Sequence, residues 1–266
     1  MLRTRRTAVG RQVPVVLAAL ACVGVTPAIA AGGSSISSAP QIAPGAQNFG
    51  NTSSGFWQGC PADYWNLSLV SGDEATVDWA TEHDSQGTRY ANQLEVYNAG
   101  VTDFSINNVE PSSEFRIGSN DRAESVFTAN TDGIYPLIFI REGFCSHTSG
   151  YGGPFDFTVS VRHAVVLSLG AVKKLASRKG VVRVSVHDPD GQPVSDPSLT
   201  VTLVGSWSGH KNQLLGSGSP TNGVVVLTVR LPKSARHRKV SVRASAHGAG
   251  YLPAQSSAKS VLVSRR

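Results

Sequence analysis

The sequence has few cysteines, a single methionine and no long apolar run. Its 266 residues include 3 cysteines and 1 methionine. The longest apolar stretch covers residues 13–25, which is too short to cross a bilayer core of about 30 Å as a helix. We therefore expect no membrane span in the processed chain.

Catalytic and metal-binding motifs are also missing. None of the 7 histidines has the helical spacing that a zinc peptidase requires. The run 205–209 resembles a serine-hydrolase elbow but places Trp207 where the nucleophile belongs. The run 188–191 has the residues of a hairpin turn and lacks the later ligands of an EF-hand. Within residues 82–84, only Glu82 and Asp84 would share a face of a strand, which indicates solvated charge rather than a metal site.

These absences predict a protein that is not an enzyme, with no catalytic residue, metal site or bound cofactor. A polysaccharide hydrolase stays open as an alternative, because its two carboxylates can lie anywhere in the acidic part of the chain. Phe56, Trp57 and Tyr151 could form a platform on which a sugar stacks. Packing in the core or beside a disulfide is the simpler interpretation of these aromatic residues.

Acidic residues are absent before Asp63, and the first 30 residues have the pattern of a secretory signal peptide. Four arginines, Arg3, Arg5, Arg6 and Arg11, form a basic region that precedes the apolar stretch. Ala28 and Ala30 supply the small residues that signal peptidase reads, which predicts cleavage before Ala31. We expect general secretion rather than twin-arginine export, and an extracellular or cell-wall location. Because arginine outnumbers lysine 17 to 7, a bacterium with a GC-rich genome is the expected source.

Two cysteines, Cys60 and Cys145, remain after removal of residues 1–30. An even pair of cysteines in an oxidising compartment predicts a disulfide. The closed loop is long, so the chain-entropy model gives an upper figure of about 4–5 kcal/mol for its contribution to stability.

The remaining chain divides into a leader and two all-β domains. Residues 31–48 are mostly Gly, Ser, Ala and Pro, and we expect a flexible leader there. Residues 49–162 contain short runs of period two, such as 65–69 and 75–79, and residues 163–266 contain similar runs rich in valine. Many short alternating runs without a helical period predict two antiparallel β-sandwiches.

Three runs of the first domain resemble bacterial pre-peptidase C-terminal (PPC) domains. They are Asp-Tyr-Trp-Asn-Leu-Ser-Leu at 63–69, residues 124–137 with Gly-Ile-Tyr at 133–135, and Gly-Pro-Phe-Asp-Phe-Thr-Val at 153–159. The resemblance implies a jelly-roll-like sandwich that accompanies secreted enzymes without catalysing a reaction. Calcium binding is implied by this family resemblance only.

The second domain resembles bacterial immunoglobulin-like repeats of adhesins and polysaccharide-active enzymes. The resemblance rests on Val-His-Asp-Pro-Asp-Gly-Gln-Pro-Val at 186–194, Thr-Asn-Gly-Val at 221–224 and Gly-Tyr at 250–251. It implies an immunoglobulin-like sandwich that serves as a spacer, stalk or binding module.

Charge is divided unequally between the two domains. Residues 49–162 contain 15 acidic and 5 basic residues, whereas residues 163–266 contain 3 acidic and 15 basic residues. Three interpretations stay open: ordinary solvated surfaces, attraction that docks the domains, or a basic domain that binds an anionic polymer. Attraction between exposed charges would weaken at high salt.

Two basic loops form the candidate polyanion-binding site: Lys173, Lys174, Arg178 and Lys179 in one loop, and Arg236, Arg238 and Lys239 in the other. No aromatic side chains alternate with these charges, and we therefore expect no nucleic acid partner. The expected partner is a cell-wall or other extracellular anionic polysaccharide. The sequence thus predicts a secreted, non-catalytic pair of binding modules at a bacterial cell surface. A structural spacer with docked domains and no ligand is the main alternative.

Overall fold

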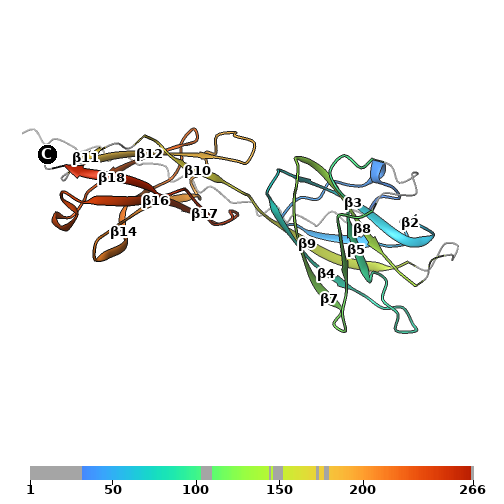
Figure 1. Cartoon of the computed structure of the whole chain (residues 1–266). Coiled ribbons are helices and arrows are strands. Elements are labelled where there is room, and N and C mark those ends of the chain that lie inside the picture. Colours follow the sequence, from blue (N-terminus) through green and yellow to red (C-terminus); the bar gives the residue numbers. More distant parts are fainter. Residues whose placement is uncertain are drawn as a thin grey trace, which may run out of the picture.

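The computed structural model describes residues 32–102, 110–143, 145, 152–171, 174–176 and 180–264, so the expected signal peptide lies outside the described residues. Nearly all of its elements are strands, and they form two lobes, each made of two sheets (Figure 1). All sheet pairs but one are antiparallel. The prediction of an all-β fold built from β-sandwiches is confirmed.

The first lobe contains the strands that precede residue 163. One sheet has the order β1 (Gln47–Asn51), β9 (Pro154–Arg162), β4 (Glu74–Thr81) and β7 (Arg122–Thr128). The other has the order β2 (Gly55–Trp57), β3 (Cys60–Leu69), β8 (Gly133–Ile140), β5 (Gln93–Val96) and β6 (Ser113–Arg116). A short 3-10 helix, η1 (Ile36–Ser38), precedes both sheets in the chain.

Aromatic side chains fill the space between these two sheets. Trp65 of β3 contacts Phe157 of β9 edge to face, with ring centroids 4.9 Å apart. Phe139 of β8 lies 4.8 Å from Phe157 and 5.6 Å from Trp79 of β4, measured between centroids. Alternate residues of β4 are buried, as the period-two pattern predicts, because successive side chains of a strand point to opposite faces.

Residues 32–48 pack against the first lobe, and the prediction of a flexible leader differs from the structure here. Gly33 forms an antiparallel bridge with Tyr64, and Gln41 forms a parallel bridge with Asn66. Ile36 and Ile42 are buried. The prediction of disorder rested on the small number of apolar residues in this segment. In the structure, backbone hydrogen bonds to β3 and the burial of two isoleucines hold the segment in place.

The second lobe contains the strands from residue 166 onward. Its first sheet has the order β10 (Val166–Leu169), β12 (Gly180–His187) and β15 (Val224–Val229). Its second sheet has the order β11 (Lys174–Ala176), β18 (Lys259–Ser264), β16 (Lys239–His247), β13 (Thr200–Trp207) and β14 (His210–Gly218), and β17 (Ala254–Gln255) pairs with β16. The helix η2 (Lys233–Ala235) precedes β16. Valine and leucine dominate the core, with Trp207 as its one tryptophan.

The lobes meet where β9 continues into the second lobe (Figure 1). Asp73 Oδ2 lies 3.1 Å from His163 Nδ1, and the amide of Ala164 donates to Asp73 Oδ1 at 3.3 Å. Asp190 lies against Asp132 of the first lobe, and a hydrogen bond between the two carboxyls raises the pKa of Asp190. These contacts join like charges as well as one histidine–aspartate pair, so attraction between opposite net charges does not explain them.

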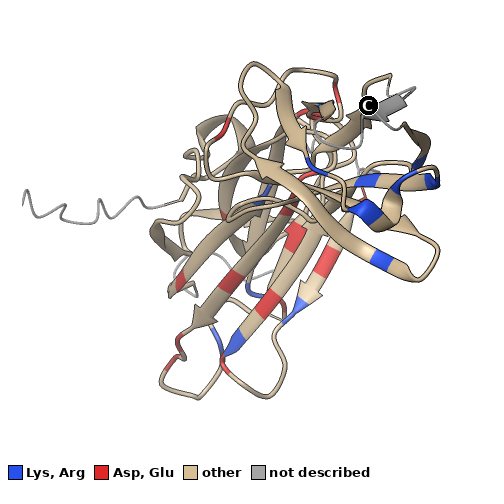
Figure 2. Cartoon of the chain, turned by 90° about the vertical axis from the view of Figure 1, so that its left-hand side faces the viewer, with Lys and Arg blue, Asp and Glu red and all other residues tan. Residues whose placement is uncertain are grey.

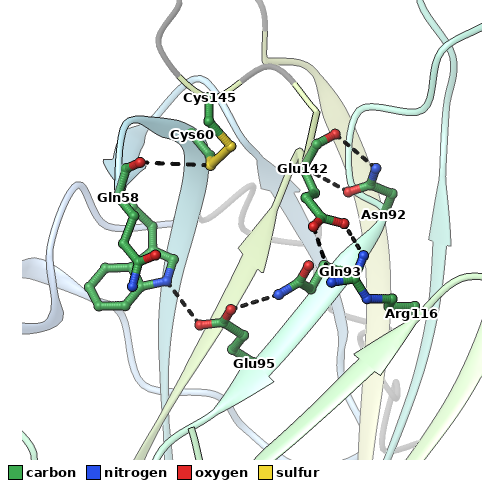
Figure 3. The surroundings of a disulfide bond; sticks show 9 residues. Gln58, Cys60, Asn92, Gln93, Glu95, Arg116, Glu142 and Cys145 are labelled. Atoms are coloured by element: carbon green, nitrogen blue, oxygen red, sulfur yellow. Dashed lines mark hydrogen bonds and ion pairs between the residues drawn. A yellow bond between two sulfur atoms is a disulfide. The ribbon is translucent and has the colours of Figure 1, made fainter. Parts of the chain in front are cut away.

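The predicted disulfide between Cys60 and Cys145 is present. It joins the first residue of β3 to the segment that follows β8. Figure 3 shows its surroundings, which include Glu95, whose Oε1 accepts a hydrogen bond from Gln93 at 2.6 Å. The Oε2 atom of Glu95 accepts from the indole of Trp57 at 2.9 Å and from the hydroxyl of Tyr97. Trp57, the register partner of Cys60, therefore connects the strand that carries the disulfide to a buried carboxylate whose two oxygens are both hydrogen-bonded.

We expect replacement of both Cys60 and Cys145 by serine to lower the free energy of unfolding of the chain 31–266 by about 2–5 kcal/mol. The physical reason is that the open chain gains conformational freedom in the unfolded state. Urea unfolding followed by tryptophan fluorescence measures the difference. Mass spectrometry after denaturation and alkylation supplies the control, because the oxidised chain 31–266 should carry no reactive thiol. Two alkylated cysteines would contradict the assignment.

Candidate functional site

The described part of the two predicted basic loops, Lys174 and residues 236–239, lies at one end of the second lobe. Lys173, Arg178 and Lys179 are outside the described residues, and only the backbone is described for Lys174. Arg236 is half-buried, and Arg238 and Lys239 are exposed. The strand register places Lys174 and Lys239 on either side of Leu262, in one row across β11, β18 and β16. Of the two groups of charges that the sequence predicted, the sheet order brings the backbone of Lys174 and that of Lys239 together.

A third segment joins this end of the lobe. The Arg238 guanidinium donates through Nη1 to the carbonyl of Ser208 at 3.1 Å, which attaches residues 236–239 to the turn between β13 and β14. That turn is followed by exposed His210 and Lys211. We call Lys174, Lys211, Arg236, Arg238 and Lys239 together the basic end. Sequence reasoning missed Lys211. The glycine at position 209 was the available signal for a hairpin, and in the structure Gly209 has a φ of 80° in the turn between β13 and β14.

The described positive charges of the second lobe are not paired with carboxylates. Among the side chains that the structure describes, no lysine or arginine after residue 162 forms an ion pair. In the first lobe, by contrast, four of the five arginines pair with a carboxylate: Arg89, Arg116, Arg141 and Arg162. Figure 2 shows blue segments gathered on the second lobe and red segments on neighbouring strands of the first.

The acidic residues of the second lobe lie toward the first lobe, away from the basic end. Asp190 contacts Asp132 of the first lobe, and Asp188 lies near it. Asp196 accepts a hydrogen bond from the hydroxyl of Tyr251 at 2.9 Å, and Tyr251 forms a bridge with His163 at the junction. The described charges of the second lobe are therefore separated along its length, with carboxylates at one end and cations without ion-pair partners at the other.

The outer face of the first-lobe sheet carries a shallow acidic pocket of about 320 Å³. Asp78 of β4 is paired in register with Glu124 of β7, and Asp156 of β9 lies on the same face. Asp156 accepts a hydrogen bond from the Gln47 amide at 2.6 Å. No described group of three or more His, Cys, Asp or Glu residues in the chain has a geometry suited to a metal ion.

Most of the other residues singled out in the sequence make structural contacts where they are described. Trp57 is buried and packs edge to face on Tyr97, with centroids 5.7 Å apart, so it is not part of an exposed platform. Phe56 is 46% exposed, and Tyr151 lies outside the described residues. In the cluster 82–84, His83 lies 3.2 Å from the carboxylate of Asp121 and Asp84 pairs with buried Arg141. Within the described chain, no helix is long and apolar enough to cross a membrane.

Comparison with known proteins assigns no family. No protein-family model matches the sequence, and no curated protein matches it. A periplasmic lysozyme inhibitor of g-type lysozyme from Aeromonas hydrophila is similar in structure, at 16% identity and a TM-score of 0.33, over 50% of this chain and 100% of that chain. An FMN-binding beta-glucuronidase from Facaelibacterium prausnitzii L2-6 is similar at 11% identity and a TM-score of 0.23, over 76% of this chain and 32% of that chain. Similarity this low assigns no function, and the resemblances to PPC and immunoglobulin-like domains stay predictions.

The repulsion between Asp78 and Glu124 on the acidic outer face can be tested by removing one of the two charges. Because like charges directly opposite on neighbouring strands repel, Glu124→Gln should raise the free energy of unfolding by about 0.2–1 kcal/mol at pH 7 and low salt. The gain should shrink in 1 M NaCl, where charges are screened. The matched control is Glu114→Gln, which removes a carboxylate paired with Arg116 and should give no gain. Equal stability of wild type and Glu124→Gln in urea titrations would contradict the repulsion.

Proposed function

We propose that the chain is a secreted, non-catalytic binding protein that attaches to an extracellular or cell-wall anionic polymer through the basic end of its second lobe. The observation that carries the proposal is the convergence of three cationic segments without a carboxylate partner on any of their described side chains. Such a field attracts anionic ligands and raises their local concentration. Export follows from the expected signal peptide, and the PPC-like and immunoglobulin-like resemblances favour an accessory module.

The geometry favours a repetitive polymer over a small anion. The cations lie on β11, on the hairpin between β13 and β14 and on residues 236–239, and Arg238 and Lys239 are exposed. An enclosed pocket for one phosphate or carboxylate would instead place buried donors around a single point. Teichoic and uronic acid polymers carry charges at regular intervals and could contact several of these side chains at once.

The catalytic alternative has less support. Burial raises the pKa of Asp63 to about 7, a value suited to a general acid, but Asp63 is completely buried and cannot contact a polymer. The exposed carboxylates Asp78, Glu124 and Asp156 occupy an open sheet face, without a cleft that would exclude water from a sugar ring. We therefore propose binding rather than hydrolysis for this chain.

The double substitution Arg238→Gln and Lys239→Gln tests the proposal. Full-length processed protein, residues 31–266, is co-sedimented with purified bacterial cell walls at 50 mM and 500 mM NaCl. We expect wild-type binding to fall steeply with salt, and the double variant to bind about 3- to 10-fold more weakly at 50 mM NaCl because two exposed ion pairs are lost. Walls from which the anionic polymers have been chemically removed should not bind the protein.

The matched control removes the same charge from elsewhere in the second lobe. Arg183→Gln with Arg243→Gln also deletes two cations, on the middle of β12 and β16, and Arg243, like Arg238, makes one hydrogen bond to the protein. This control should bind like wild type. Equal weakening of both double variants would indicate a net-charge effect rather than a site, and absence of wild-type binding at 50 mM NaCl would overturn the proposed function.

A further inference from the structure

Asp63 is a buried carboxylate with one oxygen that has no hydrogen-bond partner. Its side chain has no solvent exposure. The Oδ2 atom accepts from the amide of Asn51 at 2.9 Å and from the indole of Trp65 at 3.1 Å, whereas Oδ1 is without a partner. A buried carboxylate without full compensation is costly, and proteins pair such groups with a cation or keep them protonated. A partner for Oδ1 is therefore the missing part of this site.

The surroundings of Asp63 supply no cation. Two glycines pack against the carboxylate: a methyl group on Gly32 would lie 1.8 Å from Oδ1, and one on Gly50 would lie 2.6 Å from Oδ2. The other polar groups around it are the Asn51 and Tyr64 amides, the Trp65 indole and the Ser54 hydroxyl, which lower the pKa of Asp63 in part but carry no positive charge. The neighbouring Tyr64 hydroxyl donates to the carbonyl of Phe56. Among the described residues, no lysine, arginine or histidine forms an ion pair with Asp63.

The chain itself brings a candidate cation to this position. Gly33 is fixed to β3 by two backbone hydrogen bonds with Tyr64, which holds Gly32 against Oδ1. The expected processing site precedes Ala31, only one peptide unit, about 3.8 Å of chain, before Gly32. Cleavage there would create an α-ammonium group within reach of the unpartnered oxygen. A free amine from solution could not enter in its place, because Asp63 is completely buried.

We propose that Asp63 is a binding site for a primary ammonium group, and that its ligand is the α-ammonium of the chain's own processed N-terminus. The inference rests on the export processing that forms part of the proposed function. The new ion pair would complete the carboxylate's contacts and anchor residues 31–42 to the first lobe. The precursor, which has no amino group at this point, would hold Asp63 without a charged partner. Processing would thus change the stability of the first lobe as well as the length of the chain.

The pH dependence of stability separates the two states. In a chain without the ammonium, burial raises the pKa of Asp63 from 3.8 to about 7, so stability is greatest at low pH and falls as the pH rises from about 4 to 7. With the ammonium in place, the ionised carboxylate is paired and this fall should be absent. The two proteins should therefore differ most at neutral pH and least near pH 4.

The experiment compares chain 31–266 carrying its native amino group with the same chain extended by one glycine before Ala31. At pH 7.5 we expect the extended chain to melt about 5–15 °C lower, and at pH 4 we expect similar melting temperatures. NMR titration of the Ala31 amino group should show a pKa at least one unit above the ordinary 7.7–8.0. The Asp63→Asn variant is the matched control, because the added glycine should have no effect in its background.

Several outcomes would overturn this inference. They are equal melting temperatures of the native and extended chains at every pH, and an ordinary pKa for the Ala31 amino group. If Asp63→Asn does not fold, these two measurements on chains that keep Asp63 still decide the question. N-terminal sequencing of the exported protein tests the processing step separately. Cleavage at a site other than residue 31 or 32 would remove the ammonium from reach, and absence of cleavage would overturn the export on which the proposed function depends.

Discussion

Contact between the aromatic side chains of facing sheets is the interaction on which the first lobe depends. Trp65, Phe139 and Phe157 join β3, β8 and β9 through centroid distances of 4.8–4.9 Å, and Trp79 extends the layer to β4. Aromatic residues bury large areas and favour edge-to-face or offset geometries, which restrict how the two sheets can shift relative to each other. Because strand side chains alternate, this inner layer also decides which residues of β4, β7 and β9 face outward. The acidic outer face is a consequence of that alternation.

β3 is covered on both faces and carries a buried carboxylate. Its inner face packs in the aromatic layer, and its outer face is covered by residues 33–42 and by the cluster around Cys60 and Trp57. The first six residues of β3, Cys60–Trp65, are all buried and offer no solvent-exposed position for a charge, yet Asp63 is one of them. The cost of this carboxylate is reduced by Asn51 and Trp65 at Oδ2 and by the nearby Tyr64 amide and Ser54 hydroxyl, whereas Oδ1 has no hydrogen-bond partner. The same covering segment that buries Asp63 brings the start of the processed chain to it, so the burial and the proposed ion pair have one structural cause.

The sequence predicted the existence of most strands and the disulfide, because alternation and an even cysteine count are local or compositional features. It could not predict the sheet order. Lys174 and Lys239 share one row of the sheet because β18 lies between β11 and β16. The packing of residues 32–48 was missed because Ile36 and Ile42 are few, and backbone bridges leave no trace in composition. In the sequence, Asp63 is the first residue of a family-like motif. Only the folded chain shows that it is buried.

The separation of charge has a consequence for how the proposed attachment would orient the protein. Asp188 and Asp190 of the second lobe lie near the junction, and the first lobe has a net negative charge, so the side of the molecule away from the basic end is negative. A polyanion that attracts the basic end repels the rest of the molecule. Within a Debye length of about 8–10 Å from the polymer, this repulsion favours an end-on arrangement over one that lies flat. The first lobe would then face away from the polymer, with the outer sheet face that carries Asp78, Glu124 and Asp156 free for other contacts.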